Sequence, residues 1–336
     1  MIDEHARHVP PTWLRPFVSG YTGYRQEGVA PLRHRGLPSP ELTFIVTLDD
    51  PLAIDAHPDP GQPAESYDTL LGGLHTSPAL VSHQGRWSGV QLGLTPLGAR
   101  TLLGLRAGEL ANWDAEATDV VGAFAARLRE LVVEQPTWAG RFAVIDQLLD
   151  RRAAEAEADR RATVRPEVGY AWRRLRETRG GVGVAELAAE TGLSARRLGS
   201  LFRDEFGLAP KEAGRVFRFT YARRRIGQAA MGGRLGARGG GGTAGGGTAG
   251  GGTAGGDAGP GGGSAGSRGT AGGGAEGGGA AGRRAGATLA RLAAECGFYD
   301  QAHLAREFRA LAGCPPSVWL AEEFRFVQAS AADLGE

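Results

Sequence analysis

Six polar side chains in two short segments have the chemistry to read the edges of DNA bases. Arginine donates paired hydrogen bonds to guanine, and glutamine exchanges a pair of hydrogen bonds with adenine. Such side chains recur at helical spacing in residues 196–203 and again in residues 301–306. The candidate base-reading residues are Arg196, Arg197, Ser200, Gln301, His303 and Arg306.

A second group of arginines has the chemistry to bind phosphates, which supply most of the non-specific affinity for nucleic acid. Residues 160–238 hold 18 Arg and Lys side chains against 7 Asp and Glu, a net charge of +11 between two acidic flanks. This asymmetry favours a polyanionic partner, and the alternative is a solvated basic surface. The candidate phosphate-binding residues are Arg203, Arg215, Arg218, Arg223, Arg224 and Arg225.

The base-reading candidates lie in two copies of one repeated segment. The first copy is LAAETGLSARRLGSLFRDEFGLAP (187–210), and the second is LAAECGFYDQAHLAREFRALAGCPP (292–316). Each copy predicts a helix, a turn at a glycine and a second helix. Gly192 should end the first helix with a positive φ, and Ser194 should cap the next one. Asp300 is the predicted cap in the second copy.

Apolar spacing predicts which face of each second helix is buried. In the first copy, the residues expected to face the core are Leu198, Leu201, Phe202 and Phe206. In the second copy they are Leu304, Phe308 and Leu311. The arginine and glutamine side chains then face outward. A helix-turn-helix unit places this outer face in the DNA major groove. The alternative is a pair of ordinary helical hairpins.

Residues 166–231 and 283–322 resemble the DNA-binding domain of AraC/XylS-type transcription regulators. The most specific match is GFYDQAHLAREFRALAGCPPSVW (297–319), and residues 210–230 occupy the place of the linker helix that joins the two units. The resemblance implies base contacts from the exposed faces of both recognition helices, which also include Gly199 and Ala302.

The same resemblance implies a separate sensing or dimerisation domain, often a cupin-like β-barrel. Residues 1–150 look like the N-terminal part of a group of actinobacterial AraC-type regulators. The implied partners are double-stranded DNA, a small-molecule effector and a second copy of the chain.

One segment departs from that family pattern, in which only a few residues separate the linker helix from the second unit. Here residues 232–282 intervene, and more than half of them are glycine. Such a composition cannot bury enough apolar surface to fold, so we expect a disordered, flexible coil. The tract should separate the two units and cost them their fixed spacing.

The N-terminal region is expected to be β-rich at first and helical afterwards, giving an α+β multidomain chain. Strands are predicted at 41–48, 79–83 and 87–95, the last two joined as a hairpin by residues 84–86. Helices are predicted at 96–105, 118–134 and 136–153, followed by a charged linker at 151–167. The expected division is 1–155, 156–231 with the first unit and linker helix, 232–282, and 283–336 with the second unit.

The sequence offers less support for an enzyme than for a DNA-binding protein. His34, Glu41, His75 and His83 fall in the β-rich region, but no His-x-His pattern supports a metal site, and Cys296 and Cys314 fit a helical core. We therefore expect no metal, no cofactor and no catalysis. No apolar run is long enough for a transmembrane helix, and no secretory signal is seen, so a cytoplasmic protein is expected.

One alternative function stays open: a small-molecule-binding or enzymatic N-terminal domain with a degenerate DNA-binding tail. A pocket within residues 1–150 that holds clustered titratable groups would favour this alternative.

Overall fold

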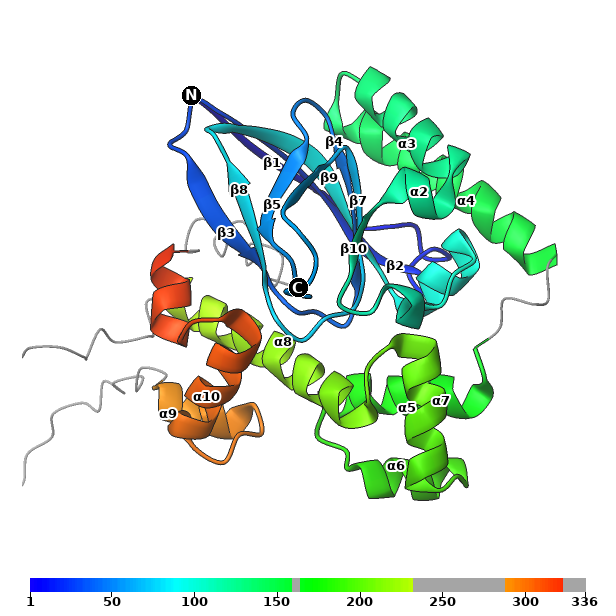
Figure 1. Cartoon of the computed structure of the whole chain (residues 1–336), viewed down its shortest axis with the longest axis vertical. Helices are drawn as coiled ribbons and strands as arrows, with labels where there is room; N and C mark the ends of the chain where they lie inside the picture. The colour runs from blue at the N-terminus through cyan, green and yellow to red at the C-terminus, as the bar shows by residue number, and fades with distance from the viewer. Residues whose placement is uncertain (159–163, 232–287, 323–336) are drawn as a thin grey trace, which may run out of the picture. The chain divides into compact units, whose positions relative to one another are not determined.

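The structure is a computed structural model that describes residues 1–158, 164–231 and 288–322. Within these ranges the chain has the predicted α+β architecture, with a β-rich N-terminal region, helices packed on it and an all-helical C-terminal region (Figure 1). The predicted Gly-rich tract at 232–282 lies outside the described residues. No helix in the described ranges has the length and apolar character needed to cross a membrane.

Two antiparallel sheets form the β-rich region. The larger sheet has the strand order β1-β2-β9-β4-β7-β10 and the smaller one β3-β8-β5-β6. The larger sheet comprises β1 (Ile2–His8), β2 (Val18–Glu27), β9 (Arg86–Leu94), β4 (Leu42–Thr47), β7 (Thr69–Gly72) and β10 (Asp114–Glu116). The smaller sheet comprises β3 (Leu32–Gly36), β8 (Ala79–His83), β5 (Leu52–Ala56) and β6 (Glu65–Tyr67).

The two faces of the larger sheet bury different partners, as β4 shows. Successive side chains of a strand point to opposite faces. Phe44 and Val46 belong to the main core, which also holds residues of the helices that follow the sheets. Ile45 instead packs in a second core cluster with Ile54 and Val81 of the smaller sheet. The two sheets therefore face one another, and helices cover the opposite side of the larger sheet.

The predicted hairpin of strands 79–83 and 87–95 is wrong, although both strands exist. β8 pairs with β3 and β5 in the smaller sheet, whereas β9 pairs with β2 and β4 in the larger one. The connecting turn carries Gly85 at φ 95°, and a Cβ atom there would lie 2.4 Å from the Val29 carbonyl oxygen. The turn thus passes the chain from one sheet to the other.

Helices follow the sheets as predicted, with different breaks. Residues 96–105 form α1 (Pro96–Gly98) and one π-helical turn, η1 (Ala99–Leu103). The predicted helix 118–134 is divided at Gly122, whose φ of 58° no regular helix accepts. The remaining elements are η2 (Ala107–Leu110), α2 (Ala117–Val121), α3 (Ala123–Glu134) and α4 (Trp138–Ala158). The predicted linker at 151–167 is helical up to Ala158.

The C-terminal region consists of α5 (Pro166–Glu177), α6 (Val184–Thr191), α7 (Ala195–Phe206), α8 (Pro210–Met231), α9 (Leu289–Glu295) and α10 (Gln301–Ala312). Trp172 of α5 packs between Phe206 and Phe217, with ring centroids 4.4 and 5.1 Å away. Cys296 and Cys314 are both buried, which confirms their predicted place in the core.

The second repeat copy packs directly on α8 rather than being held by the Gly-rich tract alone. The Phe219 ring of α8 lies 5.0 Å from the Phe308 ring of α10. Arg215 and Glu307 form an ion pair between the same two helices at 2.7 Å. The second unit therefore has contacts of its own with α8, and the effect of the inserted tract on the spacing of the two units stays a prediction.

Candidate DNA-binding surface and ligand pocket

The first repeat copy forms a helix-turn-helix unit from α6 and α7. Gly192 ends α6 at φ 68°, and the Ser194 hydroxyl accepts a hydrogen bond from the Arg197 backbone N–H at 3.2 Å. Both features match the prediction. They follow from local rules, since glycine adopts a positive φ without steric cost and serine satisfies a free N–H at a helix start.

Helix α7 separates buried and exposed side chains along its length. Leu198, Phe202 and Phe206 are buried, while Leu201 is only partly buried against the core. Gly199 is buried, so it is not part of the outer face that the resemblance implied. The predicted contact residues on the exposed face are Arg196, Arg197, Ser200 and Arg203.

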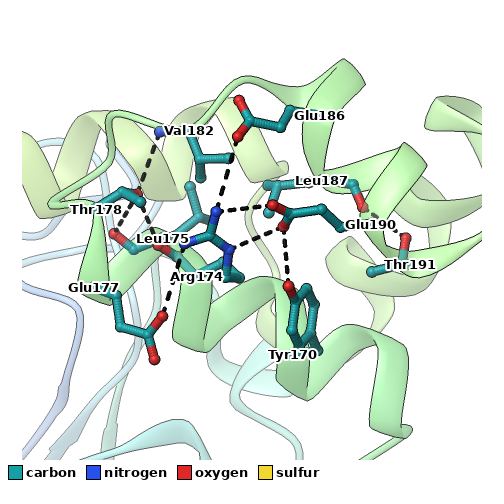
Figure 2. A network of polar contacts seen from close by, with 10 residues as sticks. All are labelled: Tyr170, Arg174, Leu175, Glu177, Thr178, Val182, Glu186, Leu187, Glu190 and Thr191. Atoms are coloured by element: carbon teal, nitrogen blue, oxygen red, sulfur yellow. Dashed lines mark hydrogen bonds and ion pairs between the residues drawn. The ribbon is translucent and has the colours of Figure 1, made fainter.

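A charged network fixes α6 on the preceding helix α5 (Figure 2). The Arg174 guanidinium donates two hydrogen bonds to the Glu190 carboxylate, at 2.8 and 2.9 Å, and the Tyr170 hydroxyl donates a third at 3.2 Å. The hydrogen bonds and charge of Arg174 lower the pKa of Glu190 below its ordinary value. The carboxylate ends of Glu177 and Glu186 lie within 3.9 and 3.8 Å of the same guanidinium. This network sets the position of α6, and α6 in turn supports α7.

The second repeat copy, α9 and α10, has the same local construction. Gly297 adopts φ 76°, and the Asp300 carboxylate accepts a hydrogen bond from the His303 backbone N–H at 2.6 Å. Glu295 occupies the repeat position of Glu190, and it too accepts from an arginine of a supporting helix, Arg225 of α8, at 2.8 Å. The repeated Leu-Ala-Ala-Glu motif thus places one carboxylate in each unit where it anchors the first helix.

The predicted reading residues of α10 differ in their surroundings. Gln301 and Arg306 are exposed. His303 is half-buried, its Nδ1 atom accepts a hydrogen bond from the Tyr299 backbone N–H at 3.3 Å, and its ring lies 5.4 Å from the Phe298 ring. His303 is therefore tied to the turn before α10. The neighbouring Tyr299 side chain is 92% exposed, which sequence reasoning did not single out.

Most of the arginines of α8 that were predicted to bind phosphates make contacts within the chain. Arg215 pairs with Glu307, Arg225 pairs with Glu295, and Arg218 donates a hydrogen bond to the Gly180 carbonyl at 2.7 Å. Arg223 and Arg224 line a pocket described below. These contacts give the arginines structural roles, and their phosphate contacts stay predictions.

The C-terminal end of α7 is covered by the N-terminal region. Arg106 forms an ion pair with Asp204 at 3.0 Å, and Arg100 approaches Glu205 at 3.6 Å. Gly108 lies so close to α7 that a Cβ atom there would be 2.8 Å from the Asp204 carbonyl oxygen. The exposed outer face of α7 is therefore its N-terminal part, and no pattern in the sequence indicated this contact.

A pocket of about 650 Å³ opens between the two sheets and α8. Its larger-sheet wall is formed by residues that alternate along neighbouring strands, including Thr22 of β2, Gln91 of β9 and Thr43 of β4. Arg223, Arg224 and Gly227 of α8 and Trp319 of the helical segment 316–322 line it as well. The pocket thus contacts the N-terminal sheets and the C-terminal helical region together.

Of the weak metal candidates, His34, Glu41 and His75 line this pocket and His83 does not. Burial, with a smaller effect from His83, lowers the pKa of His34 to about 4. Burial also lowers the pKa of His75 and of His83. These imidazoles are therefore neutral at pH 7. In the described part of the chain, no group of three His, Cys, Asp or Glu residues could hold a metal ion.

A buried polar network lies behind the pocket, and sequence reasoning missed it. His57 Nδ1 lies 2.8 Å from the Asp114 carboxylate, and the Gln62 side chain donates to the Tyr67 hydroxyl at 3.0 Å and to the Asp114 carbonyl at 2.6 Å. These residues join β6 and β10 through a loop, so the network fixes the edge of the larger sheet. Asp114 also lines the pocket.

Comparison with known proteins gives fold-level similarity only. The chain matches no known protein-family profile and no curated protein. Among solved structures it is similar to ToxT from Vibrio cholerae O395, with a TM-score of 0.45 and 10% identity over 90% of this chain and 96% of that one. It is also similar to unsaturated fatty acid bound wild-type ToxT from Vibrio cholerae strain SCE256, with a TM-score of 0.43 and 10% identity over 90% of this chain and 94% of that one. At this level the similarity identifies neither site residues nor a ligand for this chain.

Proposed function

We propose that this chain is a sequence-specific DNA-binding transcription regulator of the AraC/XylS type, controlled by a small molecule that binds its N-terminal domain. The observation that carries the proposal is the duplicated helix-turn-helix unit. Both copies have a positive-φ glycine, a capped second helix and an anchoring glutamate, and both expose polar side chains on the outer face of the second helix. A major groove accepts a helix presented in this way.

The proposed roles divide by exposure. Base reading is assigned to Arg196, Arg197, Ser200, Gln301, His303 and Arg306. Phosphate binding is assigned first to Arg203, which is exposed beside the reading face. Arg215, Arg218, Arg223, Arg224 and Arg225 remain phosphate candidates with a second, intramolecular function. The basic charge of this region should attract DNA of any sequence and make affinity depend on salt.

The experiment is selection of DNA fragments by the purified full chain, followed by fluorescence anisotropy on the selected site. Arg196→Ala should weaken binding to that site by about 1–3 kcal/mol and relax the base preference at one position. Arg127→Ala is the matched control, because Arg127 is an exposed arginine of α3 whose ion-pair partner, Glu130, lies on the same helix. Equal losses on the selected site and on random DNA would show that Arg196 contacts only phosphate. No enrichment of any sequence would refute specific recognition.

Ligand control is proposed because the pocket includes residues of α8. This helix also packs directly on α7 of the first helix-turn-helix unit, and it contacts the second unit through the ion pair of Arg215 with Glu307. A small molecule that contacts Arg224 or Gly227 therefore lies against the element that carries both units. An effector changes DNA affinity only to the extent that it binds the DNA-competent arrangement differently.

The second candidate function is a small-molecule-binding or enzymatic N-terminal domain with a degenerate DNA-binding tail. The observation that favours it is the titratable lining of the pocket by His34, Glu41, His75 and Asp114. It predicts tight ligand binding or turnover by a protein that selects no DNA sequence. Fragment selection separates the two candidates, because only the regulator enriches a site.

A further inference from the structure

The pocket wall on the larger sheet includes three glycines, Gly20, Gly72 and Gly93, and several polar side chains, beside the apolar side chains of Ile45 and Leu70. One row across the sheet pairs Gly20 with Gly93, Gly93 with Thr43, Thr43 with Gly72 and Gly72 with Asp114. Three glycines in such a row leave a trough where side chains would normally fill the space between two sheets.

The two carboxylates of the wall lie in that trough. A Cβ atom at Gly93 would be 2.8 Å from Glu41 Oε2, and one at Gly72 would be 2.7 Å from Asp114 Oδ1. Substitution of either glycine would therefore collide with a carboxylate. The glycines make room for negative charge on this side of the pocket.

Four polar side chains beside the trough make no hydrogen bond or ion pair within the described part of the chain. Glu41 makes hydrogen bonds with Ser39 through its backbone, but its carboxylate has neither a hydrogen bond nor an ion pair among the described residues. The same holds for the side chains of Thr22, Thr43 and Gln91. Gln91 is exposed, and Glu41, Thr22 and Thr43 are half-buried. Four unused groups facing one cavity are therefore available to a ligand.

Two carboxylates, Glu41 and Asp114, and the guanidinium of Arg7 line the larger-sheet side of the pocket. Burial keeps His34 and His75 uncharged, since it lowers the pKa of each. Arg35 also lines the pocket, but it forms an ion pair with Glu322. On the α8 side the pocket is positive, because Arg223 and the exposed Arg224 line it. Glu41 and Arg224 form no ion pair with each other in the described structure, so the two charges face the same cavity separately.

We propose that this pocket binds a small zwitterionic molecule, whose ammonium group contacts the Glu41 carboxylate and whose acidic group contacts the Arg224 guanidinium. Thr43 and Gln91 would supply further hydrogen bonds to the ammonium end. The inference rests on the proposed ligand control and names the chemical class of the ligand. A ligand of this kind would join the larger sheet to α8 through its own two charges.

The test uses matched probes on the full chain without DNA. The zwitterions are γ-aminobutyrate, δ-aminovalerate and ε-aminocaproate, and each is compared with the alkylamine and the fatty acid of the same carbon number. Binding is measured by thermal shift and by calorimetry at millimolar ligand. At least one zwitterion should bind more tightly than both of its single-charge relatives. Equal binding by the matched acid, equal binding by the matched amine, or no binding by any zwitterion would overturn the proposal.

Two isosteric variants test which charged residue binds each end of the zwitterion. Glu41→Gln should weaken binding of the zwitterion by about ten- to a hundredfold, the range expected when a hydrogen bond to a charged group is lost. Binding of the matched acid should be unaffected. Arg224→Gln should weaken binding of the zwitterion and leave binding of the matched amine unaffected. Glu134→Gln, on the exposed end of α3, is the control for a general change of charge. An unchanged zwitterion affinity in Glu41→Gln would refute the assignment. Because DNA is absent, failure of DNA recognition would leave these results intact and would count only against the proposed regulator.

Discussion

The ion pair of Arg215 with Glu307 gives the sharpest test of how the two helix-turn-helix units are held together. Sequence reasoning placed Arg215 on DNA phosphates, whereas the structure places its guanidinium 2.7 and 3.4 Å from the two carboxylate oxygens of Glu307. The side chains are 32% and 22% exposed. Exposed pairs contribute about 0.2–1 kcal/mol, and hydrogen bonds to charged groups contribute about 1.5–3 kcal/mol. A coupling of about 1 kcal/mol is therefore expected for this half-buried pair.

The perturbation is a double-mutant cycle with Arg215→Gln and Glu307→Gln. If the pair positions α10 on α8, each single variant should weaken DNA binding by about fivefold, the equivalent of 1 kcal/mol. The double variant should be no weaker than either single variant, because both remove the same contact. Urea unfolding of the three variants reports the same coupling on the stability of the C-terminal region.

The salt dependence of DNA affinity separates this role from a phosphate contact. Each phosphate contact that is lost lowers the slope of log affinity against log salt by about one. Arg215→Gln should leave the slope unchanged, and Arg203→Gln, the exposed matched control, should lower it. A lower slope in Arg215→Gln, together with full DNA affinity in Glu307→Gln, would refute the positioning role and restore the phosphate contact.

Two further predictions concern pH and the inserted tract. Folded His34 has a pKa of about 4 against an ordinary 6.5, so the unfolded chain binds a proton that the folded chain does not between these values. The free energy of unfolding should therefore fall as pH drops from about 6.5 to 4, by up to about 1.4 kcal/mol per pH unit, and His34→Gln should flatten this dependence in unfolding titrations. Shortening residues 232–282 to a few residues should leave affinity for the selected DNA site within a few fold, because contacts with α8 hold the second unit; loss of that site by a folded variant would contradict this.

Features set by neighbouring residues were predictable from the sequence. The positive φ of Gly192, the cap at Ser194 and the burial of Leu198 each depend on residues a few positions away, and all three were confirmed. The repeat strengthened them, because the same rules applied to Gly297 and Asp300. Local rules also located the strands at 42–47 and 79–83.

Features set by distant residues were not predictable. The strands on either side of Gly85 were assigned to one hairpin, because no local signal says that a short turn changes sheets. Arg215 was assigned to phosphate because its partner Glu307 lies 92 positions further along the chain. The contact of Arg106 with Asp204 spans 98 positions and gave no signal. Spacing showed which arginines a helix presents, but it could not show which of them the protein itself would engage.

Helix α8 contacts both the second helix-turn-helix unit and the pocket that is proposed to bind a ligand. Arg215 and Arg225 contact the second unit, whereas Arg224 and Gly227 line the pocket. Helix α8 is continuous from Pro210 to Met231, with backbone hydrogen bonds linking successive turns, so we expect it to move largely as one body. A ligand that tightens the contact between the larger sheet and Arg224 changes DNA affinity if it favours or opposes the position of α8 in which α7 and α10 fit one DNA site. The direction of control follows from which of these positions the ligand prefers, and by linkage DNA changes the ligand affinity by the same factor.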